Sequence, residues 1–78
     1  MNTTLDNTIT EREIDLMKYI IRFKEVNGYS PTIREIQKGI NSNSTQHITY
    51  MLDDLMEKGY LTFQKKKPRT IRILRFIV

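Results

Sequence analysis

Residues 44–59 read STQHITYMLDDLMEKG, and the rest of the sequence can be interpreted outward from this stretch. Ile48, Leu52 and Leu55 recur at steps of four and three residues, which places them on one side of a helix. The stretch begins with a serine, a favourable N-cap, and ends with a lysine and a glycine, which are typical of a helix C-terminus. The pattern therefore predicts a helix over residues 44–59 with one apolar side.

The opposite side of this predicted helix carries side chains that form hydrogen bonds but have no charge. Gln46, Thr49 and Tyr50 lie there, with His47 on the flank. A helix with an apolar back and donors and acceptors on its front can read base edges in the major groove of DNA. The same pattern fits an ordinary amphipathic helix, and Thr49 and Tyr50 could equally pack against another element. The stretch alone leaves both interpretations open.

A capping box at Thr10-x-x-Glu13 predicts the start of a first helix. This helix should continue to about Asn27 and stop at Gly28, because glycine readily adopts the left-handed cap that ends many helices. Three of its apolar residues at helical spacing should be buried: Leu16, Met17 and Ile20. Phe23 should join them only in part, because it lies at the margin of this apolar side.

A second capping box, Thr32-x-x-Glu35, predicts a short helix that ends near residues 39–41. Residues 41–43 then separate this helix from the stretch described first. Two helices joined by roughly three to four residues form a helix-turn-helix. Asn41 suits such a tight turn, because asparagine tolerates the left-handed backbone conformation.

After residue 59 the apolar period changes from helical to alternating. Leu61 and Phe63 should point to one side of a strand, and residues 70–73 alternate again. The loop between these runs contains three lysines and a proline, so we expect a β-hairpin with a projecting tip. The order helix, helix, helix, hairpin predicts an α+β fold, the winged helix-turn-helix.

The formal net charge of +4 is unevenly distributed along the chain. All nine acidic side chains fall within residues 1–61, whereas residues 62–78 contain six basic side chains and no acid. Within that segment, the predicted tip gathers four cations: Lys65, Lys66, Lys67 and Arg69. Lysines can protect an exposed strand from pairing with another chain, but a tip placed one strand after a helix-turn-helix favours contact with phosphates. The sequence therefore indicates a polyanionic partner.

The composition argues against several classes of protein. The chain has no cysteine, so we expect neither disulfide bonds nor a thiolate metal site. His47 is the only histidine and has no catalytic partner in a recognisable motif, and no glycine-rich phosphate loop is present. We therefore expect a protein that is not an enzyme and has no cofactor, metal or small-molecule substrate. With no apolar run long enough to span a membrane and no visible signal peptide, we expect it in the cytoplasm.

Three segments together resemble the N-terminal DNA-binding domain of LexA-type repressors over nearly the whole chain. They are GYSPTIREI at 28–36, Leu52-x-x-Leu55-x-x-Lys58-Gly59-Tyr60-Leu61, and Lys67-Pro68-Arg69-x-Ile71-x-Ile73-Leu74. The resemblance implies that the third helix enters the major groove and that the wing contacts the DNA backbone through Lys67 and Arg69. It also implies five base-facing residues: Ser44, Gln46, His47, Thr49 and Tyr50.

The sequence departs from the family pattern in three respects. Asn41 stands where the family usually has a glycine, and asparagine tolerates that turn. The base-facing side chains differ from those of other members, so the operator sequence does not transfer. The sequence ends at Val78, before the family's second domain, which carries the Ser-Lys self-cleavage site and most of the dimer interface. We therefore expect a stand-alone domain, and autoproteolysis is not implied.

The expected organisation is a flexible N-terminus at 1–8, a winged helix-turn-helix domain at 9–75 and an apolar tail at 76–78. The expected function is that of a sequence-specific regulator of transcription that binds double-stranded DNA, with repression as the expected direction. An alternative is a protein-interaction module with the same fold, such as a small inhibitor carried by a mobile element. RNA binding is less favoured, because the deep major groove of RNA would exclude the third helix.

The apolar tail suggests a possible homodimer. Residues 74–78 would extend the second hairpin strand, and an exposed strand edge readily pairs with that of a second copy. Alternatively, Phe76 and Val78 fold back onto the first helix and complete the core of the monomer. The sequence leaves these two interpretations open.

Overall fold

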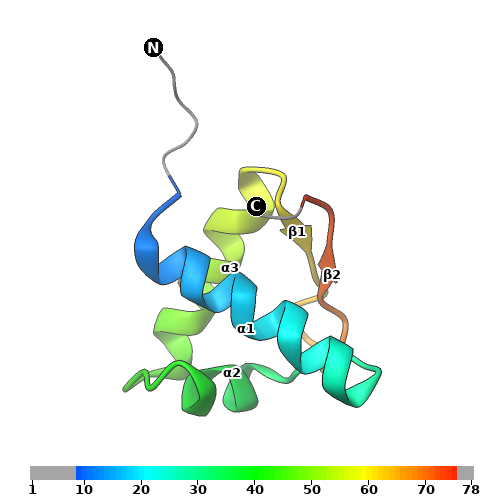
Figure 1. The fold of residues 1–78 in the computed structure, drawn as a ribbon. Coiled ribbons are helices and arrows are strands. Elements are labelled where there is room, and N and C mark those ends of the chain that lie inside the picture. The colour runs from blue at the N-terminus through cyan, green and yellow to red at the C-terminus, as the bar shows by residue number, and fades with distance from the viewer. Residues whose placement is uncertain (1–8, 76–78) are drawn as a thin grey trace.

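The computed structural model describes residues 9–75, in which three helices precede a two-stranded antiparallel hairpin (Figure 1). The elements are α1 (Glu11–Asn27), α2 (Ile33–Gly39), α3 (Thr45–Glu57), β1 (Leu61–Thr62) and β2 (Arg72–Ile73). This order confirms the predicted α+β winged helix-turn-helix. The segments predicted to be a flexible N-terminus (1–8) and an apolar tail (76–78) lie outside the described residues.

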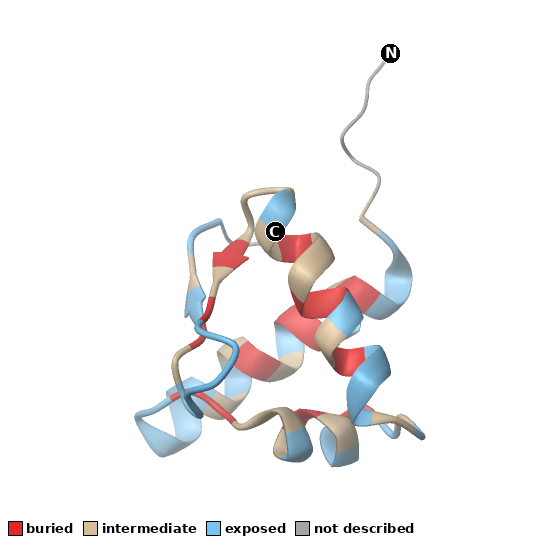
Figure 2. Ribbon diagram, turned by 180° about the vertical axis from the view of Figure 1, so that it is seen from behind, coloured by how far each residue is buried: buried red, intermediate tan, exposed pale blue. Residues whose placement is uncertain are grey.

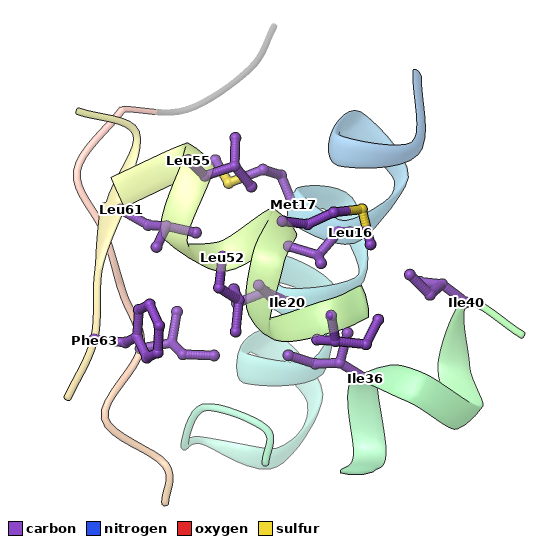
Figure 3. Close-up of a cluster of buried hydrophobic side chains, with 12 residues drawn as sticks. Leu16, Met17, Ile20, Ile36, Ile40, Leu52, Leu55, Leu61 and Phe63 are labelled. Carbon is purple, nitrogen blue, oxygen red and sulfur yellow. The ribbon is translucent and has the colours of Figure 1, made fainter. Parts of the chain in front are cut away.

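One apolar core joins the three helices to the hairpin (Figure 3). α3 contributes Ile48, Leu52 and Leu55, as the spacing predicted, and also Met51, which that spacing did not predict. Phe23 is only half-buried, and its ring packs against the rings of Tyr19 and Tyr29. The remaining buried apolar side chains come from α1, α2 and β1 and from residues next to α2 and the strands: Leu16, Met17, Ile20, Ile36, Ile40, Leu61, Phe63 and Ile71.

Both predicted capping boxes are present and fix where α1 and α2 begin. The Glu13 backbone N–H donates to the Thr10 hydroxyl at 3.1 Å, and the Thr10 N–H donates to the Glu13 carboxylate at 3.0 Å. Thr32 and Glu35 make the same reciprocal pair at the start of α2. These bonds satisfy backbone N–H groups that a helix leaves without partners in its first turn. The boundaries of both helices therefore follow from short local motifs.

Glu13 also fastens α1 to the end of α3. Glu13 is buried, with 4% of the residue exposed, and its carboxylate lies 3.1 Å from the ammonium of Lys58. The same ammonium lies 2.8 Å from the carboxylate of Asp54. A buried carboxylate needs such a partner, because an unpaired charge away from water is unfavourable. This ion pair joins the N-terminal turn of α1 to the C-terminal turn of α3.

A tight turn between α2 and α3 sets the position of the third helix. Asn41 adopts a left-handed conformation with φ of 59°, as predicted for this position. The Gln37 side chain donates to the Ser42 carbonyl at 3.2 Å and holds the turn against α2. Ser44 then caps α3 by accepting hydrogen bonds from the N–H groups of Gln46 and His47. α3 therefore leaves the turn with its first residues at the surface.

The strands of the wing (residues 61–73) are shorter than the alternating pattern predicted. Leu61 pairs with Ile73 and Thr62 with Arg72, and the ladder ends there. Two residues after Thr62, the Gln64 backbone N–H donates to the Thr70 side-chain hydroxyl at 2.9 Å. The wing loop (residues 64–69) thus begins immediately after Phe63, whose side chain still packs in the core. Figure 2 shows the loop as an exposed segment beside buried strand residues.

No helix within residues 9–75 combines the length and apolar character needed to cross a membrane.

Candidate nucleic-acid interface

The front of α3, defined by Gln46, Thr49 and Tyr50 with His47 on its flank, lies on the side opposite the core. Gln46 and Tyr50 are one helical turn apart and exposed, and the Gln46 side-chain N–H donates to the Tyr50 hydroxyl at 3.1 Å. The Tyr50 side chain projects from the surface and the residue is 63% exposed. The amide retains an acceptor oxygen and a further N–H, so the pair still offers a donor and acceptors to a ligand.

Ser44 and Thr49 are half-buried, and their hydroxyls already have partners within the protein. The Ser44 oxygen accepts from two backbone N–H groups of α3, at 3.1 and 3.3 Å. The Thr49 hydroxyl donates to the Thr45 carbonyl one turn earlier, at 3.1 Å. Each oxygen is therefore less available than sequence alone suggests, although the Ser44 proton and the Thr49 lone pairs remain free to bond a ligand.

His47 lies at one edge of the front, beside the turn and α1. His47 and Arg12 line a hollow of about 290 Å³ together with the turn residues 41–44. The Arg12 guanidinium donates to the Ile40 carbonyl at 3.2 Å, which brings a cation from the start of α1 to this edge. Sequence reasoning missed Arg12, because only the fold brings it to a turn that lies 28 residues further along the chain.

The wing lies at the other edge of the front. The Lys65 ammonium is 3.4 Å from the carboxylate of Asp53, one turn beyond Thr49 on α3. This contact places the beginning of the wing loop against α3. Lys65 is therefore partly neutralised by an acid of the protein itself, an outcome that the sequence did not indicate.

Lys66 and Lys67 form the part of the wing loop that is most open to a ligand. Both are exposed, and neither has an ion pair among the residues that the structure describes. A hollow of about 290 Å³ separates the wing loop from the start of α2, and its lining includes both lysines and the exposed Arg34. Arg34 was not singled out from the sequence as a binding residue. Its proximity to the wing depends on the position of the wing loop beside the start of α2.

Arg69 is directed toward α2 and makes several contacts within the protein. Its guanidinium donates to both carboxylate oxygens of Glu35, at 3.0 and 3.1 Å, and to the Ser30 carbonyl at 3.1 Å. It also lies over the ring of Tyr29, 4.6 Å from the centroid. The predicted cation cluster is thus divided: Lys65 and Arg69 are paired within the protein, whereas Lys66 and Lys67 are open.

The distribution of charge limits where a polyanion can approach. The first turn of α3 contains no acid, whereas Asp53, Asp54 and Glu57 follow in its second half. Cations lie on both sides of the uncharged part, from α1 on one side and from the wing on the other. A polyanion is therefore attracted to the N-terminal half of α3 and repelled from its C-terminal half. Within the described residues, no cluster of histidine and acidic side chains has the composition to hold a metal ion.

Comparison with known proteins gives a family match over most of the chain. The family described as LexA DNA binding domain matches residues 6–70. The LexA repressor of Anaeromyxobacter sp. (strain Fw109-5) is 37% identical over 65 residues, covering 83% of this chain and 28% of that protein. The LexA repressor of Finegoldia magna (strain ATCC 29328 / DSM 20472 / WAL 2508) is 36% identical over 66 residues, covering 85% and 32% respectively.

The LexA repressor of Thermobifida fusca (strain YX) is 35% identical over 66 residues, which cover 85% of this chain and 26% of that protein. The chain thus spans between 26% and 32% of the length of these three curated relatives. The matches confirm the resemblance found in the sequence.

Proposed function

Because the chain belongs to the LexA DNA-binding domain family, we propose that it binds double-stranded DNA with α3 in the major groove and the wing on phosphates. The observation that carries the proposal is the arrangement around α3. An uncharged, hydrogen-bonding front lies between a cation from α1 and cations from the wing. In such an interface, phosphate contacts position the protein and base contacts provide the sequence preference.

Each part of the interface has its own role in this proposal. Gln46 and Tyr50 meet base edges because both are exposed on the front, and the exposed His47 and the half-buried Thr49 and Ser44 border them. Lys66 and Lys67 contact backbone phosphates, with Lys65 and Arg69 alongside them in the wing. Arg12 and Arg34 add phosphate contacts on the two sides of α3. A bidentate side-chain amide such as that of Gln46 suits adenine in particular.

We further propose that binding regulates transcription, with repression as the expected direction. The three relatives are each named a LexA repressor, and a protein that occupies a site in a promoter blocks access to it. A role on DNA also agrees with the cytoplasmic location expected from the sequence. A pair of copies on two half-sites would enlarge the small interface of a single domain of this size. The exposed Leu74 after β2 leads toward the tail that could join such a pair.

The wing lysines provide the experiment that tests this function. In the variant Lys66→Ala with Lys67→Ala, affinity should fall for all duplexes alike, because phosphates carry no sequence information. The slope of log K against log salt concentration should become shallower by about one unit for each lost phosphate contact, so by about two units in all. Fluorescence anisotropy with a labelled duplex at several salt concentrations measures this slope.

The matched control removes the same charge from the outer side of α1, in the variant Lys18→Ala with Arg22→Ala. Both side chains are exposed and lie one turn apart on α1. The control should reduce affinity only slightly and leave the slope close to that of the parent protein. If the wing variant also keeps the parent slope, the wing does not contact DNA, and its lysines serve only to protect the hairpin edge.

A further inference from the structure

Resting on the proposed DNA binding, we propose that Arg69 is a positioning residue of the wing and that Glu35, although an acid, promotes DNA binding by holding it. We call the contacts of Arg69 with Glu35, Ser30 and Tyr29 the clasp. It joins the end of the wing loop to the beginning of α2, across 34 residues of sequence from Glu35. The clasp thereby determines where the open lysines of the wing lie relative to α3.

The geometry of the clasp is that of a strong, directional contact. The two guanidinium nitrogens face the two carboxylate oxygens in a parallel arrangement, which fixes orientation as well as distance. The same carboxylate completes the α2 capping box by accepting from the Thr32 N–H at 2.9 Å, so its own position is fixed by the helix. Stacking over Tyr29 restrains the guanidinium on a further side.

The ionisation of both partners agrees with this geometry. Hydrogen bonds from Arg69, and then from the Thr32 backbone, lower the pKa of Glu35 below its ordinary value of 4.5. The hydrogen bond to Glu35 raises the pKa of Arg69. The clasp is therefore fully charged near neutral pH, where DNA binding would occur.

The backbone at Arg69 shows that the loop is shaped around this contact. Arg69 has φ of 60°, a left-handed conformation that residues with a Cβ rarely adopt. Pro68 and Lys67 precede it directly, so the direction in which the guanidinium is held also sets the path of the open lysines. The Nη1 and Nη2 nitrogens of Arg69 both donate within the protein, which leaves Arg69 fewer N–H groups for a phosphate than an unpaired arginine has.

Glu35→Gln distinguishes a positioning role from a simple effect of charge, because the two predict opposite changes in DNA affinity. Removing an acid near bound DNA should tighten binding if only charge matters. If the clasp positions the wing, the same change should weaken binding, by roughly threefold to tenfold for a contact of this kind. Glutamine keeps the capping box, since its amide oxygen can still accept from Thr32. The control Glu57→Gln removes an exposed acid of α3 without touching the clasp and should bind equally or more tightly.

A second pair of variants tests whether Glu35 acts through Arg69. In an Arg69→Ala background, Glu35→Gln should no longer weaken binding, because the contact that it breaks is already absent. The proposal is overturned if Glu35→Gln binds as tightly as the parent protein, or if it weakens binding equally with and without Arg69. Circular dichroism on each variant verifies that the helices are retained.

Amide hydrogen exchange without DNA separates this inference from the proposed function. The Gln64 and Lys67 N–H groups are hydrogen-bonded across the wing loop, and their exchange should accelerate in Glu35→Gln but not in Glu57→Gln. If the parent protein binds no duplex, the proposed function fails, and the exchange rates alone decide on the clasp. Equal rates in the parent protein and Glu35→Gln would overturn the positioning role.

Discussion

Side chains of the same type have different surroundings in this small domain, and their roles follow from those surroundings. Lys65 and Lys66 are neighbours in the sequence, yet one lies 3.4 Å from a carboxylate and the other has no ion pair within the described residues. The front of α3 divides similarly: the half-buried Thr49 donates its hydroxyl proton to its own helix, whereas the exposed Gln46 amide donates one N–H to Tyr50 and keeps its oxygen and second N–H available. A residue's chemistry alone therefore does not determine whether it is available to a ligand.

Gln46 is the residue for which this distinction gives the sharpest prediction. Gln46→Ala should relax the preference at one or two positions of the binding site, at a cost of about 1–3 kcal/mol of discrimination. Thr49→Ala should have a smaller effect, because its hydroxyl proton is used within α3. Competition binding with a panel of single-base variants of the preferred duplex measures both effects. Loss of preference spread evenly over all positions would show that these side chains act on the structure and not on the bases.

At the level of elements, the close approach of α1 and α2 holds the helix-turn-helix together. Gly39 is the last residue of α2 and lies directly against the Tyr19 ring of α1, so that an added Cβ would collide with the ring. A larger residue would have to push Tyr19 out of its place beside the core or separate the two helices. Because α2 leads through the turn into α3, its position also affects the front.

Gly39→Ala should therefore lower the free energy of unfolding, by about 1–3 kcal/mol as in other overpacked sites. Chemical denaturation followed by circular dichroism measures the change. Lys38→Ala provides the control, since Lys38 is an exposed neighbour on the same helix and should have little effect. Helix propensity alone predicts the opposite sign for Gly39→Ala, a stabilisation of up to about 1 kcal/mol. A more stable variant would therefore show that Tyr19 moves aside without cost.

Local signals in the sequence predicted the elements well, and contacts between elements account for what they missed. The capping boxes, the left-handed Asn41 and the buried side of α3 depend on residues within a few positions of one another. The short strands depend on a side-chain bond from Thr70, and no alternating pattern reveals that bond. Likewise, Arg12 and Arg69 owe their positions to partners 28 or more residues away. A motif of neighbouring residues could not have identified either position.

In the whole molecule, the uneven charge of the sequence becomes a spatial arrangement. The basic wing and the start of α1, which carries Arg12, reach opposite edges of α3, although they lie at opposite ends of the chain (Figure 1). Acids lie beside several of these cations: Glu11 and Glu13 flank Arg12 in the sequence, and Asp53 contacts Lys65. The first turn of α3, which lies between these cations, contains no acid, and this is the arrangement on which the proposed DNA binding rests.

Selection of bound duplexes from a random pool, at near-physiological salt, tests the central claim that this domain reads DNA sequence. The account predicts that one half-site becomes enriched over successive rounds, and that Gln46→Ala changes the bases enriched within it. Two copies of the half-site at a fixed spacing near one helical turn or a multiple of it would indicate paired binding. A pool that remains random, although the protein is folded and retains duplexes at low salt, would contradict sequence reading by α3.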